Sequence, residues 1–385
     1  MGPRPKAART SGLARAGESG LTAGGPGEKR TCPAAAIIIE LYKLNFAQHP
    51  PMKKTNPQNF LASRPWIDLA SDADLEAYIA RQEMDELNQQ VLPALRNWHC
   101  CGYAILKGAV PIATVDRMLD EISFIRANHK SFELLIDGTA KHYQKRRLAE
   151  LEEEDLQDVG LKLCDLHTIS PGAAEISLNP VIVRFLKHVF GSAPALLQSL
   201  TFNKSSEQVI HQDFSYVFEQ REVAKLAACW VALEDISADA GPLEYFTRSH
   251  LLGADDFFNW GESNVHILNR SDAASRAADY LAHLKKQVVE KKWPSEIFLP
   301  RKGDVLIWHG LLLHGGTAMK NPNLTRKSYV CHYTSLESHH QFPDQACGGY
   351  IFNRTPKRIQ DAMKPADDRS AVRKLAGRVK RSILS

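Results

Sequence analysis

The sequence lacks the cysteine pattern of a secreted or zinc-binding protein. Its seven cysteines are scattered over 385 residues, are odd in number and include no Cys-x-x-Cys pair. A disulfide framework or a structural zinc site needs cysteines at paired spacings, so this distribution favours a reducing compartment. The adjacent Cys100 and Cys101 could form a redox pair, or they are two small core residues beside a strand. We expect the second arrangement, because unpaired cysteine usually packs as a small apolar residue.

The sequence also lacks a long apolar run and a strong net charge. No stretch approaches the ~20 residues that a membrane helix needs. The short apolar stretch 34–39 follows a long polar and glycine-rich segment, unlike the layout of a secretory signal. The net charge is +4, too small a surplus to require a polyanionic partner. We therefore expect a cytoplasmic protein with no specific nucleic-acid partner and no membrane span, and its oligomeric state stays open.

What the sequence does contain is enough apolar material for one large core. Hydrophobic residues make up 44% of the chain, and a body of about 300 residues buries roughly three-quarters of its unfolded surface. No repeat or internal linker divides this body. The glycine-rich start leaves open that translation begins at Met52. We expect a disordered tail at 1–33 and a helical extension at 34–95. One domain follows at 96–345, with an insertion at 251–300, and the chain ends in a basic tail at 346–385 with an amphipathic helix.

The spacing of apolar residues changes along the chain from helical to β-like. Residues 115–125 and 180–190 each place apolar side chains on one face of a helix. From about residue 195 onward, short β-prone runs have a period near two. Helices followed by antiparallel strands predict an α+β fold with a sandwich or barrel core. The insertion 251–300 contains a predicted helix around 273–291, and so long a connection suggests a functional lid.

A histidine and a carboxylate two residues apart form the first chemically suggestive motif. His211 and Asp213 lie in a β-prone run, in which side chains two apart project from the same face. Together they are two-thirds of the 2-His-1-carboxylate triad that holds non-haem Fe(II) and leaves positions open. A His-x-acid match also arises by chance, and it equally describes a strand histidine bonded to its neighbour.

The second half of the motif follows about a hundred residues later. His314 comes after an apolar run, and Arg326 and Ser328 follow at a spacing of two, so that both can face one ligand. An arginine fork beside a hydroxyl matches a carboxylate. A dicarboxylate co-substrate could then chelate iron at one end and reach Arg326 with the other. His309 competes with His314 as the second imidazole, but it stands next to Trp308 in the apolar run, so we expect His314.

The order of these residues resembles that of the phytanoyl-CoA dioxygenase family of Fe(II)- and 2-oxoglutarate-dependent oxygenases. The resemblance covers about residues 100–335 and rests on five segments: Gly102–Pro111, His211–Asp213, Cys229–Asp235, Gly241–His250 and Gly303–Arg326. It implies a double-stranded β-helix core flanked by helices, with Fe(II) as cofactor and 2-oxoglutarate and O2 as co-substrates. It also implies hydroxylation of a C–H bond of a small-molecule substrate, with release of succinate and CO2.

The resemblance further implies roles for single residues. Iron is bound by His211, Asp213 and His314, and Arg326 pairs with the distal carboxylate of 2-oxoglutarate. Halogenating relatives replace the ligand carboxylate by a small residue, so Asp213 favours hydroxylation. Relatives often carry a polar residue where this chain has Gly316, so a possible hydrogen bond to 2-oxoglutarate is missing here. Ser328 therefore becomes more important for binding 2-oxoglutarate. The other candidates for the co-substrate pocket are Trp230, Ser328, Asn203, Gln198 and Lys162.

Alternative interpretations remain for parts of this scheme. Trp230 is equally well explained as a large core residue. The basic C-terminal helix either packs on the body or binds an anionic surface. A non-catalytic metal- or ligand-binding barrel that acts through this tail would keep the fold and bind no 2-oxoglutarate. We favour the enzyme, because a scaffold has no need of an open ligand set with Arg326 nearby.

Overall fold

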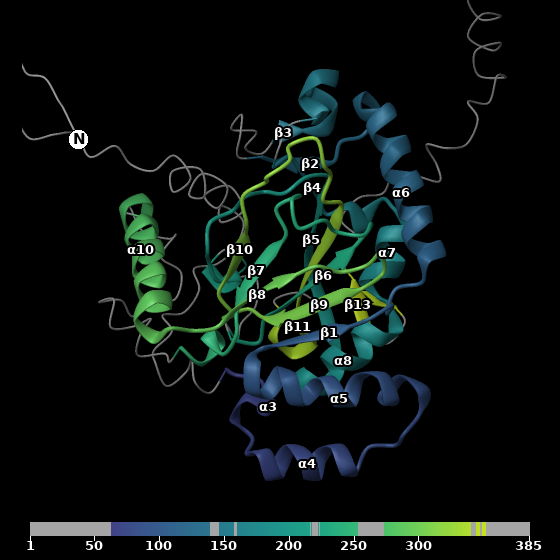
Figure 1. Cartoon of the computed structure of the whole chain (residues 1–385). Helices are drawn as coiled ribbons and strands as arrows, with labels where there is room; N and C mark the ends of the chain where they lie inside the picture. The colour runs from purple at the N-terminus through teal and green to yellow at the C-terminus, as the bar shows by residue number, and fades with distance from the viewer. Residues whose placement is uncertain are drawn as a thin grey trace, which may run out of the picture.

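The computed structural model places helices around two β-sheets (Figure 1). It describes residues 63–138, 146–157, 160–215, 217, 222, 224–252, 273–339, 344–346 and 349–351. The predicted N-terminal tail, Met52, residues 253–272 of the insertion and the predicted basic helix lie outside the described residues. The α+β prediction is confirmed.

The larger sheet has the strand order β1-β9-β6-β11-β5-β4-β2-β3. All neighbours in this order are antiparallel, and β13 joins β5 in parallel and pairs with β12. The strands are β1 (Tyr103–Leu106), β2 (Leu135–Asp137), β3 (Arg146–Arg147), β4 (Lys162–Cys164), β5 (Pro194–Phe202), β6 (Ala227–Ala232), β9 (Val305–His309), β11 (Ser328–Ser335), β12 (Asp344–Ala346) and β13 (Gly349–Ile351). The smaller sheet is antiparallel, in the order β10 (His314–Gly316), β7 (Leu243–Phe246) and β8 (Ser295–Phe298).

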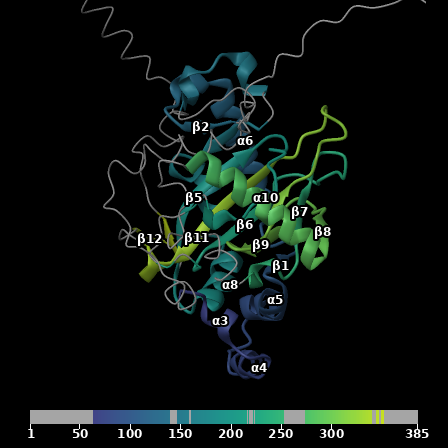
Figure 2. The same cartoon turned by 90° about the vertical axis from the view of Figure 1, so that its left-hand side faces the viewer.

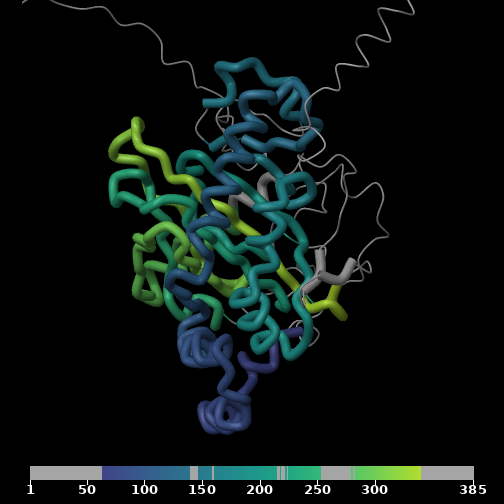
Figure 3. Tube along the Cα trace, turned by 90° about the vertical axis from the view of Figure 1, so that its right-hand side faces the viewer, coloured from purple at the N-terminus to yellow at the C-terminus, as the bar shows by residue number. Residues whose placement is uncertain are grey.

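Helices cover the outer face of the larger sheet, and α3, α4 and α5 gather at one end of the molecule (Figure 3). The α-helices are α3 (Trp66–Leu69), α4 (Asp72–Ala80), α5 (Glu86–Cys101), α6 (Ile112–Ala127), α7 (Pro171–Ser177), α8 (Pro180–Phe190) and α10 (Ala273–Lys291). Short 3-10 helices are η1 (His129–Ser131), η2 (Leu148–Glu150), η3 (Glu153–Gln157), η4 (Leu166–Thr168), η5 (Asp213–Ser215), η6 (Ser249–Leu251) and η8 (Leu336–Ser338). None of these helices has the length and apolar content of a membrane span.

Helix α8 shows how local sequence sets the boundaries of an element. The side chain of Asn179 accepts hydrogen bonds from the N–H groups of Val181 and Ile182, and Pro180 fills the first helical position. Gly191 ends the helix with φ of 71°, a conformation that costs glycine little. The helix predicted over 180–190 is therefore confirmed, with both of its ends explained.

The central strands β6, β9 and β11 are buried at every position, so their alternating side chains serve two different cores. On β6, Cys229 and Val231 pack against the helices. Trp230 between them faces the smaller sheet and packs with Tyr245 and Phe298. The two sheets thus meet face to face, as a double-stranded β-helix requires, and side chains that point inward lie between them.

The prediction that Cys100 and Cys101 are two small core residues is wrong for Cys100, whereas Cys101 is partly buried and packs against the core around Trp230. Both lie in the last turn of α5, where Cys100 is exposed and Cys101 is partly exposed, and their sulfur atoms are joined in a disulfide. The buried stripe of α5 contains Val91, Leu95 and Trp98. Cys100 follows Trp98 by two residues, which turns its side chain to the opposite side of the helix.

Candidate metal centre

The two candidate histidines lie side by side because their backbones pair. His211 and His314 form an isolated antiparallel bridge, with N–H to carbonyl distances of 2.9 and 3.1 Å in the two directions. The ring centroids are 4.3 Å apart. Gly315 permits this approach, since a Cβ there would lie 2.9 Å from the carbonyl oxygen of Gln208. A contact of two segments about a hundred residues apart thus brings the two imidazoles together.

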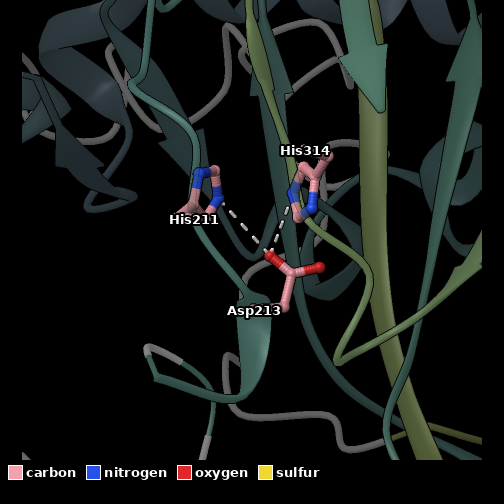
Figure 4. A group of neighbouring side chains, drawn as sticks. All are labelled: His211, Asp213 and His314. Carbon is pink, nitrogen blue, oxygen red and sulfur yellow. Dashed lines mark ion pairs between the residues drawn. The ribbon is translucent and has the colours of Figure 1, made fainter. Parts of the chain in front are cut away.

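The carboxylate of Asp213 completes the cluster. Asp213 begins the short helix η5, and its Oδ1 lies 3.7 Å from Nε2 of His211 and 3.4 Å from Nε2 of His314 (Figure 4). One ligand atom from each residue fits within 4.8 Å of the others, and all three side chains are buried. This donor set of two imidazoles and one carboxylate fits a non-haem iron site.

Backbone carbonyls fix the protonation of both rings. The Nδ1–H of His211 donates to the carbonyl of Val209 at 2.8 Å, and that of His314 donates to the carbonyl of Leu312 at 2.9 Å. Each neutral ring therefore carries its proton on Nδ1 and presents the lone pair of Nε2 to the centre of the cluster. This is the arrangement that holds a metal-binding imidazole in place.

Electrostatics keep the carboxylate ionised. Burial raises the pKa of Asp213, but the nearby His314 and then His332, with the close approach of the His211 and His314 rings, outweigh it and hold that pKa well below its ordinary value. Burial, and next the nearby His314, lower the pKa of His211. Burial also lowers the pKa of His314, but the charge of Asp213 outweighs it, so the net shift is upward. The cluster is therefore built around an anion and attracts a cation.

A second buried group, the guanidinium of Arg326, lies where a carboxylate could be held. Arg326 is 3% exposed, and its Cζ stands 5.8 Å from the ring centre of Phe202 and 5.9 Å from that of Trp230. One Nη donates to the carbonyl of Gly241 at 3.1 Å. Within the described residues, Nε of Arg326 and the buried hydroxyl of Ser328 have no hydrogen-bond partner. Donors left unpaired in this way suit an anionic ligand.

Strand register explains which pocket candidates share this space. Lys162, Phe202 and Ser328 occupy one row across β4, β5 and β11. Nζ of Lys162 lies 5.8 Å from the Phe202 ring centre and forms an ion pair with Asp137 at 3.3 Å. Lys162 is thus near Arg326 but already has a carboxylate partner.

Asn203 and Gln198 are placed differently from each other. The backbone carbonyl of Asn203 accepts a hydrogen bond from the N–H of Arg326 at 3.0 Å, so Asn203 adjoins the pocket. The side-chain amide of Gln198 contacts Nδ1 of His332 at 3.2 Å. Gln198 therefore lies beside the metal cluster through His332, which itself faces Asp213.

The match to a family model identifies the family to which the chain belongs. The model of the phytanoyl-CoA dioxygenase family matches residues 98–328, which is more than half of the chain and includes both histidines, Asp213 and Arg326. The chain belongs to the phytanoyl-CoA dioxygenase family. Its members are non-haem oxygenases with Fe(II) as cofactor and 2-oxoglutarate as co-substrate, so the resemblance seen in the sequence is confirmed.

Three solved structures illustrate the distant similarity of individual proteins to this member of the phytanoyl-CoA dioxygenase family. The non-haem α-ketoglutarate-dependent epimerase SnoN from nogalamycin biosynthesis is 18% identical, with coverage of 65% of this chain and 83% of that one and a TM-score of 0.45. The carbocyclase SnoK from the same biosynthesis is 16% identical (67% and 85% covered, TM-score 0.46). EctD from S. alaskensis, with 2-oxoglutarate and 5-hydroxyectoine, is 12% identical (79% and 96% covered, TM-score 0.46). No curated protein sequence matches the chain.

In this phytanoyl-CoA dioxygenase family member, helix α10 of the predicted insertion lies on the side of the molecule that faces the viewer in Figure 2, and it contacts the loop that carries His211 and Asp213. The hydroxyl of Tyr280 donates to the side-chain carbonyl of Gln212, the residue between the two ligands of that loop. The amide of Gln212 donates in turn to the carbonyl of Leu311 at 2.6 Å. Leu284 of α10 belongs to the same buried apolar cluster as Leu313 and Phe214. The helix is thus docked on both ligand-bearing segments, and its action as a lid stays a prediction.

The competing histidine, His309, faces away from the cluster. It belongs to the alternate face of β9, and its Nε2–H donates to Oδ2 of Asp68 in α3 at 2.8 Å. Its Nδ1 accepts the N–H of Leu311 at 3.0 Å. Both side chains of the pair are 1% exposed. The choice of His314 over His309 agrees with this geometry, because His309 ties the sheet to the helical layer.

Replacement of His309 by alanine should therefore affect stability and leave the metal site intact. The change leaves the buried carboxylate of Asp68 without its histidine partner. Breaking such a buried pair lowers the free energy of unfolding by about 3–5 kcal/mol. Denaturant unfolding measures this loss, and metal analysis of the folded fraction should give the iron content of the wild type. Iron loss without a change in stability would contradict the assignment.

Proposed function

We propose that the protein hydroxylates a C–H bond of a small-molecule substrate while it converts 2-oxoglutarate and O2 into succinate and CO2. The observation that carries the proposal is the pairing of a buried His211, Asp213 and His314 cluster with the buried, partly unpaired guanidinium of Arg326. The cluster offers a metal three donors on one side and leaves the other coordination positions of the metal open. The guanidinium of Arg326 offers a carboxylate a positively charged fork of N–H donors.

In this proposal His211, Asp213 and His314 hold Fe(II), which when bound supplies the oxidative decarboxylation of 2-oxoglutarate and the transfer of one oxygen atom to the substrate. Nε2 of each histidine donates a lone pair, because the Nδ1 protons are held by backbone carbonyls. The low pKa of Asp213 keeps its carboxylate available as an anion at neutral pH. The presence of this carboxylate in the ligand position favours hydroxylation over halogenation.

Arg326 and Ser328 would bind the distal carboxylate of 2-oxoglutarate. Burial lowers the pKa of Arg326 to about 10, so the guanidinium stays charged at neutral pH. The Trp230 and Phe202 rings wall the guanidinium and exclude water from it. Asn203 would line the same pocket, and Lys162, paired with Asp137, would add positive potential without direct contact.

A coupled assay tests the proposal. Purified protein with Fe(II), ascorbate and 2-oxoglutarate should release succinate, and a panel of small molecules should contain compounds that stimulate the release. Because SnoN is an epimerase and SnoK a carbocyclase, product mass must distinguish gain of one oxygen from loss of two hydrogens or no change. Absence of both succinate and metal-dependent 2-oxoglutarate binding would defeat the proposal. We also propose a cytoplasmic location, which fractionation of cells would test.

A further inference from the structure

The outer oxygen of Asp213 has its own hydrogen-bond donor. While Oδ1 faces the two imidazoles of the cluster, Oδ2 accepts a hydrogen bond from the indole Nε1–H of Trp308 at 2.8 Å. Nε2 of His332 lies 3.5 Å from the same Oδ2. Trp308 and His332 are 2% and 3% exposed. The two oxygens of one carboxylate are thus given different surroundings.

Strand register produces this arrangement. Gln198, His332, Ala228 and Trp308 form one row across β5, β11, β6 and β9, with side chains directed between the sheets. The methyl group of Ala228 is the smallest side chain of the row and stands between His332 and Trp308. The N–H groups of Trp308 and His332, on either side of Ala228 in the row, both face Oδ2 of Asp213.

The tautomer of His332 supports its role as a donor. The amide Nε2–H of Gln198 donates to Nδ1 of His332 at 3.2 Å, which leaves the ring proton on Nε2. Among the described residues, this Nε2 has no hydrogen bond of normal length, and Oδ2 of Asp213 is the acceptor it faces. Gln198 thereby orients His332 toward the carboxylate.

We propose that Trp308, supported by His332 and Gln198, is a positioning residue that makes Asp213 a one-oxygen ligand of the metal. This inference rests on the proposed function. A carboxylate can bind a metal through one or both oxygens. With both bound, Asp213 would take one of the three positions that 2-oxoglutarate and O2 require. A hydrogen bond that occupies Oδ2 keeps that position open, and partners of metal ligands act in this way at other sites.

The test compares two substitutions that each remove one buried indole N–H. Trp308→Phe removes the bond to Asp213, and the matched control Trp98→Phe removes an indole bond of 3.3 Å to Asp68, outside the metal cluster. Trp308→Phe should weaken Fe(II) binding about 10- to 100-fold, the usual cost of losing a partner of a metal ligand. It should also change the visible absorption of the Co(II)-substituted protein, which reports coordination number and geometry. Trp98→Phe should change neither.

A second pair of variants serves if Trp308→Phe fails to fold. His332→Gln keeps an N–H donor near Asp213, whereas His332→Leu removes it, so the glutamine variant should retain more Fe(II) affinity. If the wild-type protein binds neither Fe(II) nor Co(II), the proposed function fails. If it binds both, and Trp308→Phe or the His332 pair leaves affinity and Co(II) spectrum unchanged, the positioning role is overturned and the proposed function stands.

Discussion

Replacement of His314 by alanine is expected to abolish Fe(II) binding, and with it all metal-dependent binding of 2-oxoglutarate and all succinate release. His314 supplies one of only two imidazole donors to the cluster, and its Nε2 lies 3.4 Å from the carboxylate oxygen that faces both rings. The loss should exceed the roughly 100-fold that removal of a supporting partner costs. Metal content after gel filtration, calorimetric titration with Fe(II) under argon and succinate release together measure it.

The fold should survive this substitution, which makes the prediction sharp. His314 lies at the start of β10, and its backbone bonds to His211 do not depend on the side chain. Circular dichroism should therefore remain that of the wild type. The opposite pattern is expected for His309→Ala, which lowers stability and keeps iron. If the His314 variant retained stoichiometric iron, the assignment of the second imidazole would be wrong.

Part of this site could be predicted from the sequence, because His211 and Asp213 stand two positions apart and share one cluster. The expectation that they lie in a regular strand is wrong, since His211 forms an isolated bridge and Asp213 begins η5. The spacings of His211 with Asp213 and of Arg326 with Ser328 predicted that each pair could face one ligand, and His211 and Asp213 do meet in the metal cluster. The order of these residues along the chain resembled one family, and the family match bears that resemblance out. The existence and type of the helix over 180–190 were equally accessible, since its cap and stop residues are local.

The residues that support the ligands could not be predicted, because their roles depend on strand register. Trp308 contacts Asp213 although 95 positions of sequence separate them, so no local spacing predicts this contact. The next residue, His309, was a candidate ligand because it is a histidine. Because side chains alternate along β9, however, His309 faces the helices and Trp308 faces the metal cluster. One clue was available in the sequence, the prediction that Trp230 faces the co-substrate. The aromatic residues of β9 that share this face could be identified only once the pairing of β6 with β9 was known.

The misplaced Cys100 has a related cause. Its small size and its position before a strand favoured burial, whereas the helical stripe of Val91, Leu95 and Trp98 decides which side of α5 is covered. Burial at a helix end follows the phase of the whole helix and not the apolar character of one residue. Composition predicted that a large core exists, but assignment of single residues to that core required the phase of each element.

Replacement of Arg326 by alanine is expected to remove the selectivity for 2-oxoglutarate and leave the iron in place. The guanidinium is fully buried between two rings, so it would meet the co-substrate where water competes little for either charge. Removal of one partner from a buried, hydrogen-bonded charge pair costs about 2–5 kcal/mol. That range corresponds to a Kd for 2-oxoglutarate at least 30-fold weaker, by about 1.4 kcal/mol for each factor of ten. Fe(II) affinity without co-substrate should stay unchanged.

A comparison of ligands gives this prediction its most specific form. 2-Oxopentanoate has the carbon chain of 2-oxoglutarate without the distal carboxylate, so the wild-type protein should bind it much more weakly. Arg326→Ala should bind the two acids alike, because the group that distinguishes them is gone. Arg326→Lys should recover part of the difference, since an ammonium supplies charge but no fork, and the exposed Arg301→Ala should behave as wild type. If Arg326→Ala still preferred 2-oxoglutarate strongly, the distal carboxylate would bind elsewhere, and Lys162, whose Nζ lies 5.8 Å from the centre of the same Phe202 ring, would be the next residue to replace.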